Sequence, residues 1–154
     1  MAKGFRVQET VPHAPAVVWR YLTDFAHAED WMTGVESMTA DDAGPLRVGQ
    51  RLRFKSRGKT RLSEITGLQT GNSIALTSTQ GGITATYTYH LEPDEEGTRM
   101  TLTAVCSATG GWKLLHPLIV FAMRRSDGTH LEQLREALRL HLERSADPGR
   151  GAHA

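Results

Sequence analysis

The sequence has little of what several protein classes require. Cys106 is its single cysteine, which excludes an intramolecular disulfide, a CxxC redox motif and a cysteine-rich zinc site. Because structural disulfides belong to oxidising compartments, their absence predicts a cytoplasmic protein. The longest apolar run, residues 114–123, is short and is interrupted by His116 and Pro117. A membrane span needs roughly 20 residues, so we expect none.

The sequence also lacks an excess of charge of either sign. Lys and Arg number 18 against 17 Asp and Glu, which leaves a formal net charge of +1. Dedicated nucleic-acid-binding domains have a clear basic excess, so this balance argues against DNA as a partner. The 154 residues are enough for one domain with a substantial core. We expect a single domain over residues 1–145 and a disordered tail over residues 146–154.

The N-terminal part combines a strand with short helices. Apolar residues alternate with polar ones over residues 5–11, which predicts a strand. Pro15 suits the first turn of a helix, where its missing N–H costs nothing, so a helix is predicted over residues 15–23. A second short helical turn is expected over residues 25–31.

The middle of the chain has the pattern of an antiparallel meander, and the end has that of a helix. Short threonine-rich segments are separated by turn residues, which predicts strands over residues 35–39, 50–57, 59–68, 73–80, 83–91 and 98–108. Leucines recur at helical spacing within residues 112–144. Pro117 and Gly128 are expected to bend or interrupt this long helix.

This order of elements predicts an α+β fold. A curved antiparallel sheet of about six to seven strands would wrap around the long C-terminal helix, with two short helices after the first strand. The strand period places one set of side chains on the inner face: Phe5, Val7, Leu52, Phe54, Ile74, Leu76, Ile83, Ala85, Tyr87, Tyr89, Leu91, Met100, Leu102, Ala104 and Cys106. Several of these are small or polar-tipped, so we expect a cavity between sheet and helix.

Several segments, taken in order, carry a family resemblance. They are residues 11–19 (VPHAPAVVW), Thr23-Asp24-Phe25 followed by Trp31, Val48-Gly49, residues 81–93 (GGITATYTYHLEP), Gly97-Thr98-Arg99 and residues 131–134 (LEQL). Over roughly residues 3–145 the chain resembles the START-like (SRPBCC) superfamily, specifically its bacterial polyketide cyclase/dehydrase and lipid-transport group. The resemblance implies a helix-grip fold with a hydrophobic cavity. Members of the superfamily include cyclases, lipid carriers, hormone receptors and drug-binding resistance proteins, so the fold does not decide the activity.

Four polar residues are candidates for catalysis within such a cavity. A cyclase or dehydratase needs a general acid or base near an enolisable carbon and a donor for the developing oxyanion. Tyr87 and Tyr89 share the inner strand face, His116 lies on the long helix, and Glu9 lies among the inward positions of the first strand. The alternative interpretations are core tyrosines, a polar histidine at the helix start or cavity rim, and a solvated glutamate.

The residues expected to bind a ligand are those on the inner strand faces, a tryptophan that could cap the cavity, and apolar positions of the long helix. They are Trp31, Phe54, Leu76, Ile83, Tyr87, Tyr89, Leu102, Leu115, Ile119 and Met123. Ordinary core packing is the alternative for each of them. His27 with Glu29 and Asp30 is the nearest approach to a metal-binding triplet, but no second cluster completes it, so neither a metal nor another cofactor is predicted.

A run of basic residues is the sharpest local anomaly. It consists of Arg47, Arg51, Arg53, Lys55, Arg57, Lys59 and Arg61. The basic residues from 51 to 61 all stand at odd-numbered positions, so the two-residue period of a strand predicts that they share one face. Arg51, Arg53, Lys55 and Arg57 would then form a docking patch for an anionic partner such as an acidic carrier protein, phospholipid headgroups or RNA. The alternative is a solvated sheet surface with protected edges.

The sequence therefore predicts a protein that binds a hydrophobic small molecule, polyketide-like or lipid-like. Whether it is also an enzyme, a polyketide cyclase, aromatase or dehydratase, stays open at this level. The alternatives are a non-catalytic carrier, a drug-sequestering resistance protein, or a partner-binding module that uses the basic strand face. The long helix is compatible with a monomer and with a homodimer.

Overall fold

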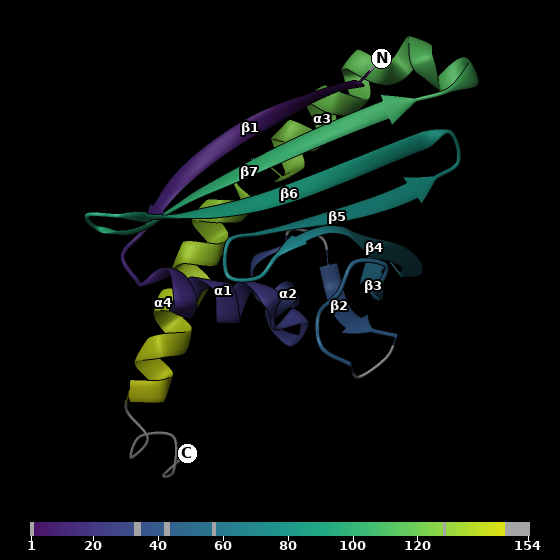
Figure 1. Ribbon diagram of the computed structural model, residues 1–154. Helices are drawn as coiled ribbons and strands as arrows, with labels where there is room; N and C mark the ends of the chain where they lie inside the picture. Colours follow the sequence, from purple (N-terminus) through teal and green to yellow (C-terminus); the bar gives the residue numbers. More distant parts are fainter. Residues whose placement is uncertain (1, 33–34, 42–43, 57, 128, 147–154) are drawn as a thin grey trace.

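The computed structural model describes residues 2–32, 35–41, 44–56, 58–127 and 129–146. Their strands form one antiparallel seven-stranded sheet in the order β1-β7-β6-β5-β4-β3-β2. The strands are β1 Ala2–Val11, β2 Val35–Ala40, β3 Arg51–Ser56, β4 Lys59–Gln69, β5 Ser73–Gln80, β6 Ile83–Asp94 and β7 Gly97–Ala108. The sheet is bent, and α1, α2 and α4 lie together on one side of it (Figure 1). The predicted α+β helix-grip fold is confirmed.

The helices occupy both of the predicted regions, but the C-terminal one is divided. They are α1 Pro15–Thr23, η1 Phe25–His27, α2 Ala28–Trp31, η2 Gly110–Leu115, α3 His116–Asp127 and α4 His130–Ala146. Pro117 lies in the first turn of α3, where it leaves no helical hydrogen bond unmade. The expected break near Gly128 separates α3 from α4, while Gly128 itself lies outside the described residues. The tail predicted to be disordered begins at Ala146, which still belongs to α4. Residues 147–154 lie outside the described residues.

The core lies between the inner sheet face and α4. Leu131, Leu134 and Leu138 of α4 are each at most 1% exposed. The helix packs on β1 and β7 and also contacts α1 and α2. Antiparallel register places Phe5, Ala104 and Tyr87 side by side on neighbouring strands, and residues paired in this way share a face. The inner-face periodicity predicted for these strands therefore holds.

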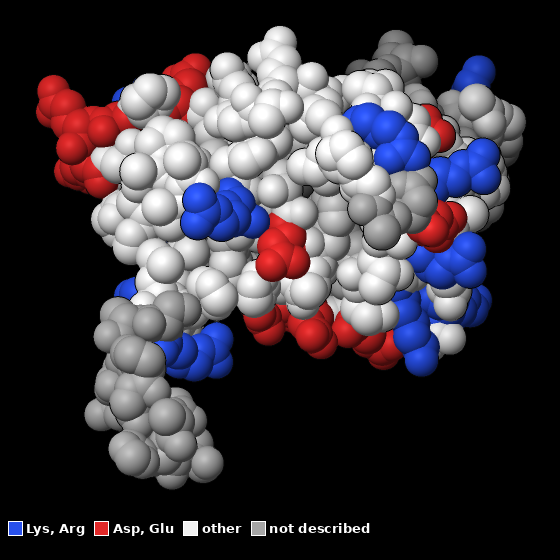
Figure 2. Space-filling model, turned by 60° about the horizontal axis from the view of Figure 1, so that its bottom comes forward, with Lys and Arg blue, Asp and Glu red and all other residues white. Residues whose placement is uncertain are grey.

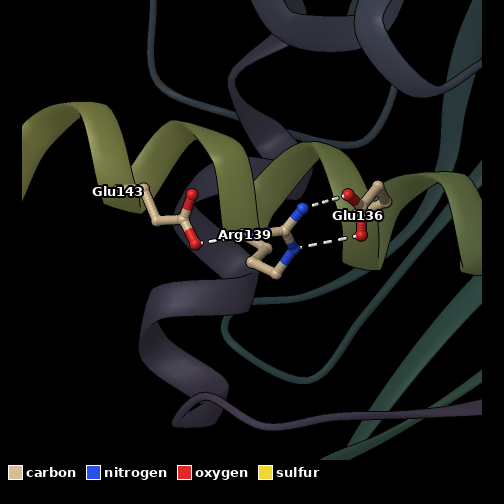
Figure 3. Close-up of polar contacts among 3 residues, drawn as sticks. All are labelled: Glu136, Arg139 and Glu143. Atoms are coloured by element: carbon tan, nitrogen blue, oxygen red, sulfur yellow. Dashed lines mark hydrogen bonds and ion pairs between the residues drawn. The ribbon is translucent and has the colours of Figure 1, made fainter.

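Ion pairs join α4 to the sheet and also lie on its outer surface. Arg135 donates to the Glu9 carboxylate, which ties α4 to β1. On the solvent side, Arg139 lies between two glutamates of the same helix: Nε is 3.1 Å from Glu136 Oε2, and Nη1 is 2.7 Å from Glu143 Oε1 (Figure 3). The hydrogen bond from Arg139 lowers the pKa of Glu136. Because these groups are exposed, they add little to stability.

A ring cluster joins the short helices to α4. Tyr21 of α1 stacks on His27 of η1 with ring centroids 4.7 Å apart, and His141 of α4 lies 5.3 Å from Tyr21. Only 4% of Tyr21 is exposed. Desolvation, together with the charge of Asp30, raises the pKa of Tyr21 to about 12. The phenol therefore holds its proton more tightly in the folded protein than in the unfolded chain.

This pKa predicts a loss of stability at high pH. The raised pKa stabilises the fold fully below the usual tyrosine pKa of 10.0, and this contribution falls as the pH rises towards about 12. Urea midpoints measured across that interval should drop more steeply for the wild type than for Tyr21→Phe, which has no phenol to ionise. Equal slopes for the two proteins would show that Tyr21 does not contribute to the alkaline transition.

Candidate functional site

A pocket of about 650 Å³ opens on the inner side of the sheet, away from the strands that α4 covers. Strands β2 to β6 supply most of its wall, Met32 follows α2, and His130 begins α4. The volume lies in the range of sites that bind drug-sized molecules. The pocket therefore has the size that the predicted ligand requires.

One part of the pocket is apolar and aromatic. Its wall includes Met32, Val35, Met38, Phe54, Leu76, Ala85, Tyr87 and Tyr89. Behind this wall, Trp31 packs edge-on against Tyr89, with centroids 5.6 Å apart and an interplanar angle of 89°. His130 lies 6.1 Å from the Trp31 ring and 6.3 Å from the Tyr87 ring. These contacts hold a buried imidazole and two phenol-bearing side chains at one surface.

The other part of the pocket is polar. It is lined by Ser56, Thr60, Arg61, Ser63, Ser78, Thr79 and Gln80. The Ser63 hydroxyl already donates to the Thr77 carbonyl at 3.3 Å. Arg61 is half-buried, and among the described residues no hydrogen bond or ion pair joins its guanidinium to another group. The pocket lining, as described, contains no Asp or Glu, so Arg61 gives this end a positive charge.

The turn between β3 and β4 brings Arg61 to this position. Its length also shows that the basic run does not share one strand face as predicted. Gly58, with a φ of 75°, lies in this turn. Beyond it, Ser56 pairs with Lys59, and Phe54 pairs with Arg61. Directly paired residues share a face, so Lys59 and Arg61 lie on the inner face with Phe54. The prediction that the whole basic run shares one face is wrong for these two residues. Because the turn has two residues, odd-numbered residues of β4 lie on the same face as even-numbered residues of β3.

The predicted docking patch occupies the opposite, outer face of β3. Arg51, Arg53 and Lys55 are exposed there, whereas Arg57 lies outside the described residues. Arg53 pairs with Asp41 at 3.3 Å. Basic side chains gather on the right-hand side of Figure 2, at the end that carries β2 to β4, with acidic ones interspersed. An anionic partner for this patch stays a prediction.

The predicted ligand-binding residues fall into two groups. Phe54, Leu76, Tyr87 and Tyr89 line the pocket. The others do not: Trp31 packs behind the aromatic wall, Leu102 is fully buried, Ile83 is half-buried, Leu115 is 47% exposed, and Ile119 and Met123 are half-buried on α3. Leu115, Ile119 and Met123 are predicted cavity residues only if a single long helix crosses the sheet. Instead, α3 packs against β1 and β7, at the edge remote from β2.

Two of the predicted catalytic residues also lie outside the pocket lining. The buried His116 donates from Nε2 to the Cys106 carbonyl at 2.6 Å, which joins α3 to β7. Glu9 does face inward, as its position in β1 predicted, but it pairs with Arg135. Only Tyr87 and Tyr89 of the four meet in the pocket. Cys106 is fully buried, and desolvation raises the pKa of its thiol, which keeps it protonated.

Several pocket residues were missing from the predicted site, and two of them, Arg61 and His130, add a cation and an imidazole to it. Arg61 would have emerged from pairing the strands across the turn at Gly58 instead of counting odd positions through it. His130 begins α4 just after the break near Gly128, so its place depends on where the long helical segment divides. Sequence periodicity gives no signal for that division beyond the glycine itself.

The comparison with protein families decides where the chain belongs. The family model described as polyketide cyclase / dehydrase and lipid transport matches residues 3–139. The chain belongs to this family. No curated protein sequence matches it.

Solved structures show the same fold as this polyketide cyclase/dehydrase and lipid-transport family member. The Zhui aromatase/cyclase from Streptomyces sp. R1128 has a TM-score of 0.70 at 15% identity, with 95% of this chain and 96% of that chain covered. The di-domain aromatase/cyclase StfQ of the steffimycin biosynthetic pathway has a TM-score of 0.72 at 12% identity, covering 93% and 52%. A Thermus thermophilus protein has a TM-score of 0.70 at 24% identity, covering 88% and 97%.

Two further observations concern the described residues. Among them, no three His, Cys, Asp or Glu side chains gather closely enough to hold a metal ion. Their helices are also too short or too polar to cross a membrane.

The position of His116 predicts a structural effect. His116→Ala removes a buried hydrogen bond and leaves the Cys106 carbonyl unsatisfied, which should lower the free energy of unfolding by about 1–3 kcal/mol. Urea denaturation measures this loss. The matched control is His90→Ala, which should cost much less because the His90 side chain is 40% exposed and, among the described residues, bonds only to the exposed Glu92 carboxylate. Affinity for a pocket ligand should be unchanged in both variants, and a loss of affinity in a stably folded His116→Ala would restore this residue to the site.

Proposed function

We propose that this protein binds an elongated apolar molecule that carries an acidic or carbonyl oxygen at one end. The observation that supports this is Arg61, a half-buried cation at the polar end of an otherwise apolar and aromatic pocket. A guanidinium presents several N–H donors in a fixed plane and suits a carboxylate, an enolate or a polarised ketone. The apolar body of such a ligand would lie along Phe54, Leu76 and Tyr87.

The chemistry of this pocket favours polyketide-like or lipid-like ligands. A polyketide intermediate combines an apolar or aromatic skeleton with ketone and enol oxygens, and a fatty acid combines an acyl chain with one carboxylate. Both match a pocket with one polar and one apolar end. Two of the structural neighbours are described as aromatase/cyclases, and the family description includes lipid transport, which supports both ligand classes.

Ring closure or dehydration of the ligand is the second candidate function. The observation that favours it is that Tyr87 and His130 line one wall with ring centroids 6.3 Å apart, beside Tyr89. A phenol and an imidazole supply a general acid and a general base, while Arg61 would stabilise an enolate oxygen. A carrier or a drug-sequestering protein would use the same pocket without turnover.

The role of Arg61 is tested with two fluorescent probes of similar shape. Anilinonaphthalene sulfonate is anionic, and phenylnaphthylamine has the same aromatic body without the sulfonate. Arg61→Gln should weaken binding of the anionic probe at least about tenfold, because a charge-assisted hydrogen bond is lost, and should change the neutral probe little. Fluorescence titration gives both affinities.

The matched control for this experiment is Arg51→Gln on the outer face, which should leave both affinities unchanged. Equal weakening of the two probes by Arg61→Gln would indicate a change of pocket shape and not the loss of a charge contact. No weakening of either would remove Arg61 from the binding site.

Turnover is tested separately with a synthetic poly-β-ketone thioester. If the pocket catalyses ring closure, wild-type protein should change the product distribution seen without protein, and Tyr87→Phe or His130→Gln should lower that effect at least about tenfold. Chromatography with mass detection follows the products, and the anionic probe shows that the variants still bind. A product distribution identical with and without wild-type protein would favour the carrier.

A further inference from the structure

An exposed apolar surface lies on η2 and α3, outside the pocket. We call it the apolar ridge. Its residues and their exposed fractions are Trp112 46%, Leu114 89%, Leu115 47%, Leu118 64% and Phe121 62%. Five large apolar side chains within ten consecutive residues form a concentrated patch. Monomeric proteins seldom leave such a patch on their surface unless something binds there.

Helix α3 is apolar on its inner side as well. His116 is buried, Ile119 and Met123 are half-buried, and the helix packs against β1 and β7. An ordinary surface helix would turn polar residues outward from such a contact. At α3, the outward positions instead carry Leu118 and Phe121, so packing within the domain does not account for them.

The chain around the apolar ridge is mainly basic. Lys113, Arg124 and Arg125 flank the ridge, the sequence has no Asp or Glu between residues 97 and 126, and Asp127, the last residue of α3, is the one acidic residue of that helix. Arg125 continues the helical line of Leu118 and Phe121 at i+7 and i+4. Two copies of this chain facing each other through the ridge would bring like charges together. Anionic headgroups would complement them.

Trp112, at one end of the apolar ridge, lies near the β5 residues that line the polar part of the pocket. Trp112 packs on the turn between β5 and β6, where a Cβ on Gly82 would come within 2.5 Å of its Cδ1 atom. Gln80, two residues before that glycine, lines the polar part of the pocket. A surface that covered the ridge would therefore lie close to the pocket residues of β5.

We propose that η2 and α3 dock on a lipid bilayer that contains anionic phospholipid. Trp112, Leu118 and Phe121 enter the boundary between headgroups and acyl chains, and the flanking basic side chains contact the headgroups. The contact is peripheral, since α3 has only 12 residues. Docking in this orientation brings the β5 residues of the pocket lining towards the bilayer. The docking rests on the apolar ridge and its flanking basic residues, and not on the identity of the pocket ligand.

Co-sedimentation of the full chain with vesicles tests this proposal. We expect binding to vesicles of phosphatidylcholine mixed with phosphatidylglycerol, weaker binding to phosphatidylcholine alone, and a loss of the difference at high salt. Leu118→Ser combined with Phe121→Ser should weaken binding at least about tenfold, because both side chains lose their burial in lipid. Arg124→Gln combined with Arg125→Gln should remove the preference for the anionic vesicles.

The matched control is Leu140→Ser, which removes an exposed apolar side chain from α4 and should bind vesicles as the wild type does. Thermal unfolding checks that every variant is folded, and the anionic probe checks that its pocket is intact. Absence of wild-type binding to both vesicles overturns the proposal, as does equal binding by the double serine variant. A dimer in sedimentation velocity that this variant dissociates, without vesicle binding, would show that a second copy covers the apolar ridge.

Discussion

The width of the sheet relative to one helix is the constraint on which the rest of this structure depends. Seven strands span about 29 Å, whereas a helix with its side chains is about 10 Å wide. Helix α4 buries its leucines on β1 and β7, and α1 and α2 fill the space beside it. The inner face of the remaining strands is covered only in part. A pocket at β2 to β6 is the space that this mismatch leaves.

The same constraint explains why the pocket has two kinds of wall. Near α4, inward side chains touch other side chains, and Tyr89 and Leu76 are nearly fully buried. Near the β3–β4 turn, no helix lies above the described part of the sheet, and the inward positions carry Arg61, Ser63 and Gln80. Polar side chains are tolerated there because water reaches Arg61 and Gln80, while the buried Ser63 donates to the Thr77 carbonyl. The gradient from buried to open is thus also a gradient from apolar to charged.

Sequence periodicity predicted the strands, the early helices and the inner-face residues well, because each depends on neighbours a few residues apart. Phe54, Leu76, Tyr87 and Tyr89 were placed in the site for this reason. Periodicity did not place Arg61 and His130, because their positions depend on how one element connects to the next. The two-residue turn decides the face of Arg61, and the division between α3 and α4 decides the place of His130. A complete set of pocket residues needs these connections, which a local pattern does not encode.

The β3–β4 turn has an evolutionary consequence. Lengthening it by one residue would exchange the faces of the neighbouring β4 residues, so that Thr60 would take the place of Arg61 opposite Phe54, and Leu62 that of Ser63 opposite Leu52. A register shift between Ile65 and Gly67 already exists farther along β4 and shows that the strand accommodates such irregularity. One insertion at the turn would thus exchange the cationic side chain at this wall position for a neutral one without any substitution in β4. Loop length, and not only side-chain substitution, is then a route by which members of such a fold diverge in ligand preference.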